Sequence, residues 1–142
     1  MITDALLRLS DAQALTTTAV STNTIDLGVA RDMGAGEDLY MYFTIPTTLE
    51  GGTSVSFQAI TSAAANLGTP TVVGMTGAIV TASLVAGYKA AICINPSVFA
   101  KGQRYLGAQY TIVGTYTAGT VTADIVHDIA DFKTYASGFS VT

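Results

Sequence analysis

The side chains best suited to acid–base chemistry or metal binding gather near the C-terminal end of the sequence, where His127 is the single histidine. Histidine titrates near neutral pH and is the commonest general acid or base. Asp124, Asp128 and Asp131 are close in sequence, and on a helix they would lie around it. The stretch alternates as a strand does, and on a strand His127 points away from Asp124 and Asp128. We therefore interpret His127 as a residue at a strand end, without a catalytic or metal-binding role.

Two other features indicate chemistry only weakly. Cys93 has no basic neighbour in the sequence that would lower the pKa of its thiol, so we expect a small buried residue. The segment from Arg31 to Asp38 places acidic residues beside Gly34 and Gly36, but the spacing does not match a calcium-binding loop, and we interpret it as a loop before a strand. The sequence contains no phosphate-binding, hydrolase or zinc-protease motif. We expect no catalytic residues, no cofactor and no metal.

Composition indicates a single domain with an unusual surface. The chain has 142 residues and a net charge of −4, which argues against nucleic acid as a partner. Charged residues are 11% of the total, against about 25% in a typical soluble domain. Residues 51–88 contain no charge, yet polar residues interrupt every apolar run, so we also expect no membrane partner. The chain is poor in lysine and glutamate, which are also the residues depleted at protein–protein interfaces. We therefore expect a partner, or copies of the same chain, to cover much of the surface. The alternative is a threonine-rich sheet surface that faces solvent.

The elements that position these residues are predicted to be short strands. Apolar and polar residues alternate clearly from Thr53 to Ile60, and apolar residues share one face in three later segments, at 88–94, 104–116 and 120–129. The aromatic run 40–45 is a further strand that we expect to end at Pro46, and Ala118-Gly119 is expected to form a hairpin turn. Weaker strand candidates are 24–29, 71–74 and 79–84. About eight strands without intervening helices predict an all-β antiparallel sandwich, jelly roll or barrel.

The first residues follow a different pattern. Ile2, Ala5, Leu6, Leu9 and Ala12 have helical spacing, which predicts a short amphipathic helix. Such a helix either packs on the domain or forms an arm that becomes ordered against a neighbouring molecule.

Most of the chain resembles, in order, the capsid cement or decoration proteins of short-tailed bacteriophages of the Bordetella type. The matching stretches are MITDALLRLSDAQALTTTAVSTNTIDLG at 1–28, GAGEDLYMYFTI at 34–45, GGTSVSFQAITSAAANLGTPTVV at 51–73, INP at 94–96, GQRYLGAQYTI at 102–112 and TAGTVTADIV at 117–126. The resemblance implies a jelly-roll fold and no enzymatic activity. It also implies a homodimer on the outer surface of an icosahedral virion capsid, bound to the major capsid protein, after synthesis in the cytoplasm of the bacterial host.

On this interpretation the chain divides into an N-terminal arm over residues 1–22 and a jelly-roll domain over residues 23–142. The arm is the expected adhesive segment, because its leucines have no strong strand partner in the sequence. The candidate residues for contact with the capsid or within the dimer are Leu6, Leu7, Leu9 and Leu15. The alternative is that these leucines close one end of the sandwich.

A second hypothesis is a β-sandwich on the virion that binds carbohydrate or attaches to the host. Tyrosine rings stack on sugars, and the candidates are Tyr40, Tyr42 and Tyr116. The alternative is that these tyrosines belong to the core, which is the more common position of a tyrosine in a strand.

Overall fold

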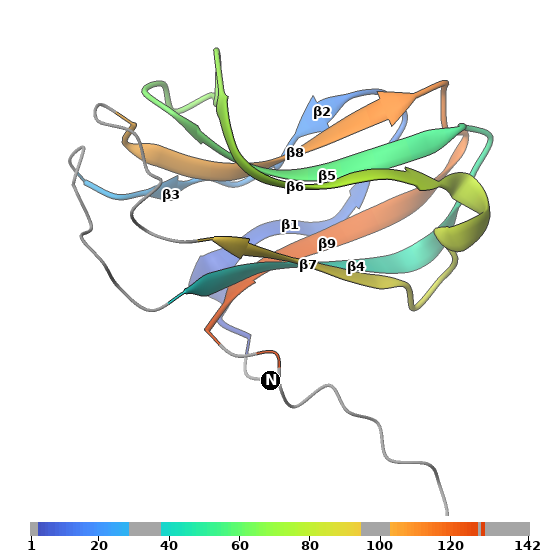
Figure 1. Cartoon of the computed structure of the whole chain (residues 1–142), viewed down its shortest axis with the longest axis horizontal. Coiled ribbons are helices and arrows are strands. Elements are labelled where there is room, and N and C mark those ends of the chain that lie inside the picture. The colour runs from blue at the N-terminus through green and yellow to red at the C-terminus, as the bar shows by residue number, and fades with distance from the viewer. Residues whose placement is uncertain (1–2, 29–37, 95–102, 128, 130–142) are drawn as a thin grey trace, which may run out of the picture.

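Two antiparallel sheets pack face to face and form a sandwich (Figure 1). The computed structural model describes residues 3–28, 38–94, 103–127 and 129. Its strands are β1 (Arg8–Ala14), β2 (Ala19–Val20), β3 (Ile25–Asp26), β4 (Leu39–Glu50), β5 (Ser54–Ser62), β6 (Thr71–Val80), β7 (Lys89–Ile94), β8 (Tyr105–Val113) and β9 (Ala118–Val126). Two short 3₁₀ helices, η1 (Ala5–Leu7) and η2 (Thr81–Ser83), complete the described elements. The prediction of an all-β antiparallel sandwich is confirmed.

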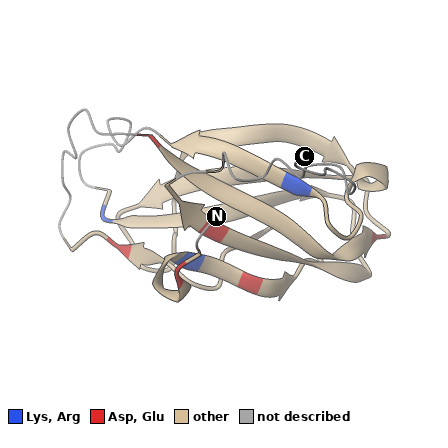
Figure 2. Ribbon diagram, turned by 90° about the horizontal axis from the view of Figure 1, so that it is seen from below, with Lys and Arg blue, Asp and Glu red and all other residues tan. Residues whose placement is uncertain are grey.

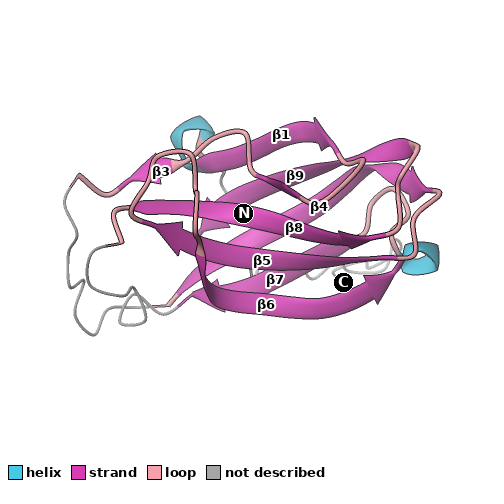
Figure 3. Cartoon of the chain, turned by 90° about the horizontal axis from the view of Figure 1, so that it is seen from above, coloured by secondary structure: helices cyan, strands magenta, loops and turns pink. Residues whose placement is uncertain are grey.

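The strand order makes the sandwich a jelly roll. One sheet has the order β1-β9-β4-β7 and the other β2-β8-β5-β6, with β3 also paired to β8 (Figure 3). Since β2 and β3 both pair with β8, they act as two halves of one strand. Strands from the two ends of the chain therefore lie side by side in each sheet, which is the nested order of a jelly roll.

Three aromatic rings join the two sheets at the centre of the core. Phe43 from β4 stacks on Phe57 from β5 at a centroid distance of 5.0 Å, and Tyr110 from β8 meets both rings edge-on. The Tyr110 hydroxyl lies 2.7 Å from Ser10 Oγ on β1, so its polar end also has a partner in the opposite sheet. For β5 and β8, the inner face that the sequence predicts is the face that the core uses.

Strand β5 departs from simple alternation, because both of its faces are buried. Val55, Phe57 and Ala59 enter the core as predicted. Ser54 and Ser56 lie on the outer face yet are 8% and 9% exposed. They are small and lie between neighbouring strands, whose larger side chains shield them. The pattern thus predicts the direction of each side chain correctly but not its exposure.

Several predicted boundaries are wrong. Pro46 does not end the aromatic strand, and β4 continues to Glu50. The pairing of β4 with β9 shifts register between Thr44 and Thr47, and such an irregularity accommodates a proline. The predicted turn at Ala118-Gly119 lies within β9, and the chain turns before it, at residues 114–117. The weak candidate at 71–74 lies within β6, whereas the one at 79–84 contributes only its first two residues to β6 and continues into η2.

The N-terminal segment is also different from the prediction. Residues 8–14 form β1, which pairs with β9, so the amphipathic helix over residues 2–15 is wrong. Its helical part is η1 alone, where the Asp4 carboxylate accepts a hydrogen bond from the Leu6 N–H. The proposed arm over residues 1–22 therefore shortens, because β1 and β2 are strands of the two sheets. No helix among the described residues has the length and apolar character needed to cross a membrane.

Candidate functional site

The residues that the sequence analysis considered for acid–base chemistry or metal binding do not form a reactive site among the described residues. His127 is exposed and follows directly after β9, whereas Asp124 is buried on the outer face of that strand. Asp128 and Asp131 lie outside the described residues, as does the glycine-containing loop before Asp38. Within the described ranges, no group of three or more histidine, cysteine, aspartate or glutamate side chains could hold a metal ion.

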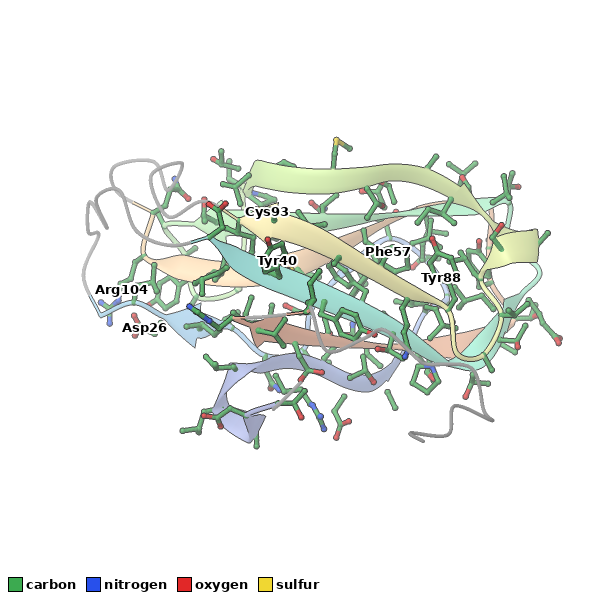
Figure 4. All side chains as sticks on the ribbon, turned by 60° about the horizontal axis from the view of Figure 1, so that its bottom comes forward. Asp26, Tyr40, Phe57, Tyr88, Cys93 and Arg104 are labelled. Atoms are coloured by element: carbon green, nitrogen blue, oxygen red, sulfur yellow. The ribbon has the colours of Figure 1, made fainter. Side chains whose placement is uncertain are left out.

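Cys93 lies at the surface, contrary to the expectation that it is buried. It is on β7 opposite Tyr40 of β4, on the outer face of the sheet (Figure 4). Desolvation, together with a hydrogen bond to Asp38 and the negative charge of its carboxylate, raises the pKa of the Cys93 thiol. A raised pKa keeps the group in the protonated form, which is the poor nucleophile.

The three tyrosines proposed for sugar stacking are mostly unavailable. Tyr42 is 5% exposed and Tyr116 is 1% exposed, and the Tyr116 hydroxyl lies 2.6 Å from Thr81 Oγ1. Only Tyr40 is partly exposed. A shallow hollow of about 150 Å³ lies beside Tyr42, lined also by Lys89, Ala90, Ala91 and Ile129. This volume is below the roughly 300–1,000 Å³ of typical ligand pockets.

The outer face of the β1-β9-β4-β7 sheet carries most of the charge of the sandwich (Figure 2). Its strands contain Arg8, Asp11, Glu50, Lys89 and Asp124. Arg8 Nε lies 2.9 Å from Asp124 Oδ1, and the side chains are 33% and 6% exposed. The hydrogen bond and charge of Asp124 raise the pKa of the Arg8 guanidinium. This ion pair fixes the start of β1 against β9.

The outer face of the opposite sheet has no such groups. Strands β5, β6 and β8 contain no aspartate, glutamate, lysine, arginine or histidine. The charged pair of that sheet, Asp26 and Arg104, lies at its end, where Arg104 Nε is 2.6 Å from Asp26 Oδ1 (Figure 4). We call the surface formed by the outward side chains of β5, β6 and β8 the uncharged face.

The pairing of the three strands arranges this face in rows. Opposed residues of antiparallel strands project to the same side. The rows, written β6–β5–β8, are Val80–Ser54–Val113, Ala78–Ser56–Thr111, Met75–Gln58–Gln109 and Val72–Ile60–Gly107. The outer strands carry large apolar side chains that remain exposed: Val80 at 58%, Met75 at 56%, Val113 at 55% and Val72 at 44%. An uncharged surface with several exposed large apolar groups is typical of an interaction site.

Of the four predicted interface leucines, the structure leaves two at the surface. Leu9 and Leu15 are 0% and 1% exposed and belong to the core, because β1 turns them toward the opposite sheet; as surface contacts they are a wrong prediction. Leu6 and Leu7 are 86% and 37% exposed on η1, directly before Arg8. We call these two residues the leucine tip. Leu9 and Leu15 are an even number of positions apart, a spacing that fits a strand and could have indicated their burial.

Comparison with known families gives one match. The model of the Bbp16 family matches residues 9–125, which extend from the second residue of β1 to the penultimate residue of β9 and thus cover the sandwich. The family name suggests a Bordetella phage protein, which agrees with the phage association implied by the sequence resemblance. No curated protein matches the chain.

Proposed function

The chain belongs to the Bbp16 family, a phage protein family, and we propose that it is a cement or decoration protein of the virion. In this role it binds the outside of an icosahedral capsid as a dimer and stabilises contacts between subunits of the major capsid protein. The observation that carries the proposal is a rigid jelly roll whose uncharged face and leucine tip offer apolar side chains for contact.

The proposed mechanism is mechanical rather than catalytic. A protein that binds only the expanded, mature arrangement of a shell shifts the equilibrium toward that arrangement by mass action. Two sheets joined by three interlocked aromatic rings provide a body that transmits load without deforming. The modest binding free energies of many copies then add up over the shell.

We assign the leucine tip to the contact with the major capsid protein. Leu6 projects into solvent, although it is a large apolar side chain next to the ordered Arg8–Asp124 pair. The ion pair holds η1 at a fixed place beside β9. The leucine tip therefore loses little conformational entropy when it binds. This assignment keeps the adhesive role of the N-terminal segment but confines it to residues before β1.

Decoration of undecorated shells tests the proposal. Purified shells of the phage are mixed with the chain, and bound copies are counted by cryo-electron microscopy while shell rupture is followed on heating. We expect near-complete occupancy and a higher rupture temperature. The variant Leu6→Asp with Leu7→Asp should bind markedly less at the same concentration, whereas Val85→Asp, an exposed valine in the loop before β7, should bind normally. Shells that remain bare with the unaltered chain would refute the cement role.

The carbohydrate-binding alternative loses its main support, since Tyr42 and Tyr116 are buried.

A further inference from the structure

We propose that the uncharged face is the surface through which two copies of the chain bind each other, sheet against sheet. The assignment of this face rests on the dimer of the proposed function, but it is argued from the face itself. Nothing in the family match or the leucine tip indicates which surface joins the two copies.

One end of the face already shows what kind of group covers it. The loop between β5 and β6 folds back so that Leu67, 2% exposed, lies over Gly107, and Ile60, which is paired with Gly107, is 0% exposed. A methyl group built on Gly107 would lie 2.3 Å from Leu67 Cδ1, so the absence of a side chain there makes room for the leucine. The chain thus covers the Gly107 end of the last row with its own apolar side chain, whereas Val80, Met75 and Val113 in the other rows remain more than half exposed.

The pattern of large and small side chains is self-complementary. In the rows of Val80 and Ala78, the middle strand presents Ser54 and Ser56, which are small and shielded, while Val113 and Val80 beside them stand in solvent. When two such faces meet, the large side chains of one copy can lie over the small residues of the other, as in the core of a sandwich. A two-fold axis places the same patch on both partners, so one surface is sufficient.

Charge also favours a second copy over a charged partner. Two uncharged faces bring no like charges together, and neither copy has to desolvate an ion. A copy that packed on the opposite sheet would have to desolvate charged groups such as Arg8, Asp11 and Lys89, which costs free energy. The leucine tip lies beside β9 on that other sheet and stays uncovered in the dimer.

The dimensions of the face give the size of the contact between two copies. Three strands about 4.8 Å apart and nine residues long at about 3.3 Å per residue make a surface of roughly 14 by 30 Å. Its projection is therefore about 430 Å², and the relief of the side chains makes the accessible area larger than the projection. A specific dimer of standard size buries about 800 Å² of accessible surface per partner, so a contact through this face alone is a small one, of roughly half that size in projection.

Contact through the face is favoured over contact through the edge of β6. Among the described residues, β6 pairs with β5 alone, so its other edge has no strand partner. The pairing with β5 shifts register twice along β6, and Gly77 has a positive φ of 76°. Such irregularities are a common protection of edge strands against pairing with another chain.

Analytical ultracentrifugation of the free protein over a dilution series tests the assignment. We expect the unaltered chain to sediment as a dimer at micromolar concentration. Met75→Asp and Val113→Asp each place a carboxylate on the face, and each should raise the dimer dissociation constant roughly 100-fold or more. Val85→Asp is the matched control, since Val85 is 50% exposed but lies outside the three strands, and it should remain dimeric. Near-UV circular dichroism should show the same tertiary fold for all three variants.

Three outcomes would overturn the assignment. One is an unaltered chain that is monomeric throughout the series. Another is a dimer that survives both substitutions on the face. The third is a pair of face variants that stay dimeric but no longer decorate shells, which would show that the capsid covers this face. Failure of the cement role is seen separately: the unaltered chain would then leave shells bare, even if the face variants dissociate the dimer.

Discussion

The two sheets contribute equivalent inner faces to the core but carry very different outer faces. Inside, Phe43 from one sheet stacks on Phe57 from the other, and both are 1% exposed or less. Outside, the β1-β9-β4-β7 sheet has a partly buried ion pair and several exposed charges, whereas β5, β6 and β8 have none. The difference teaches that the low charge of the chain is local. It belongs to one sheet, which is therefore expected to face a second copy, while the other sheet keeps a charged outer face with the leucine tip beside β9.

The largest expected effect comes from the feature that the sheets share. Phe43→Ala and Phe57→Ala each remove a fully buried ring, and each should lower the free energy of unfolding by about 3–5 kcal/mol, because a cavity remains and the stacking partner is lost. Urea denaturation of both variants measures the loss. Similar values would show that the sheets contribute equally at the centre, and a loss below about 1 kcal/mol for either would contradict the central role of the aromatic contact.

The next effect tests the charged sheet. Asp124→Asn keeps the shape of the side chain but removes the charge that balances Arg8, and the free energy of unfolding should fall by about 1–3 kcal/mol. Arg8 is one-third exposed, so water still solvates part of the unpaired guanidinium and limits the loss. Asp11→Asn is the control, because Asp11 also contacts Arg8, at 3.2 Å, but is 71% exposed. It should change stability by about 0.5 kcal/mol or less, and equal losses in the two variants would refute the distinction.

The smallest effect concerns the exposed ion pair at the end of the uncharged sheet. The hydrogen bond from Arg104, supported by that from the Gly28 N–H, lowers the pKa of Asp26 from 3.8 to about 2. As the pH falls, Asp26 is protonated at a higher pH in the unfolded chain than in the folded chain. The contribution of the pair to stability is therefore present above about pH 4 and is lost as the pH falls toward 2. In Asp26→Asn the free energy of unfolding should therefore fall less steeply over this range. Urea midpoints of both proteins between pH 2 and 5 measure the slopes, and identical slopes would contradict the shifted pKa.

The alternation of apolar and polar residues along the chain predicts much of the fold. It assigns the inward residues of β5, β7, β8 and β9 to the correct face, because the two-residue period of a strand is a local property of the backbone. It predicts boundaries less well. Pro46 is expected to end a strand, but the strand continues, since an irregular pairing with β9 accommodates the missing N–H.

The candidate sites are harder to predict. The four leucines form one set in the sequence, yet Leu9 and Leu15 lie in the core and Leu6 and Leu7 at the surface. Their spacing suits a helix, and the pairing of β1 with β9, more than 100 residues away, decides otherwise. Cys93 is exposed, the reverse of what is expected, and Tyr42, a candidate for sugar stacking, is buried, both for a similar reason. Exposure on the outer face depends on neighbouring strands and on the chain that follows β9.

By itself, the sequence determined that the chain forms short alternating strands, that residues 51–88 carry no charge, and that no familiar catalytic motif is present. These are properties of residue type and local spacing, and they do not require knowledge of distant contacts. Only the tertiary structure decided that the uncharged segments of β5 and β6 meet an equally uncharged β8 and form one continuous face. That outcome depends on which strands pair across long stretches of chain, and pairing is fixed by the packing of the whole core rather than by any one segment.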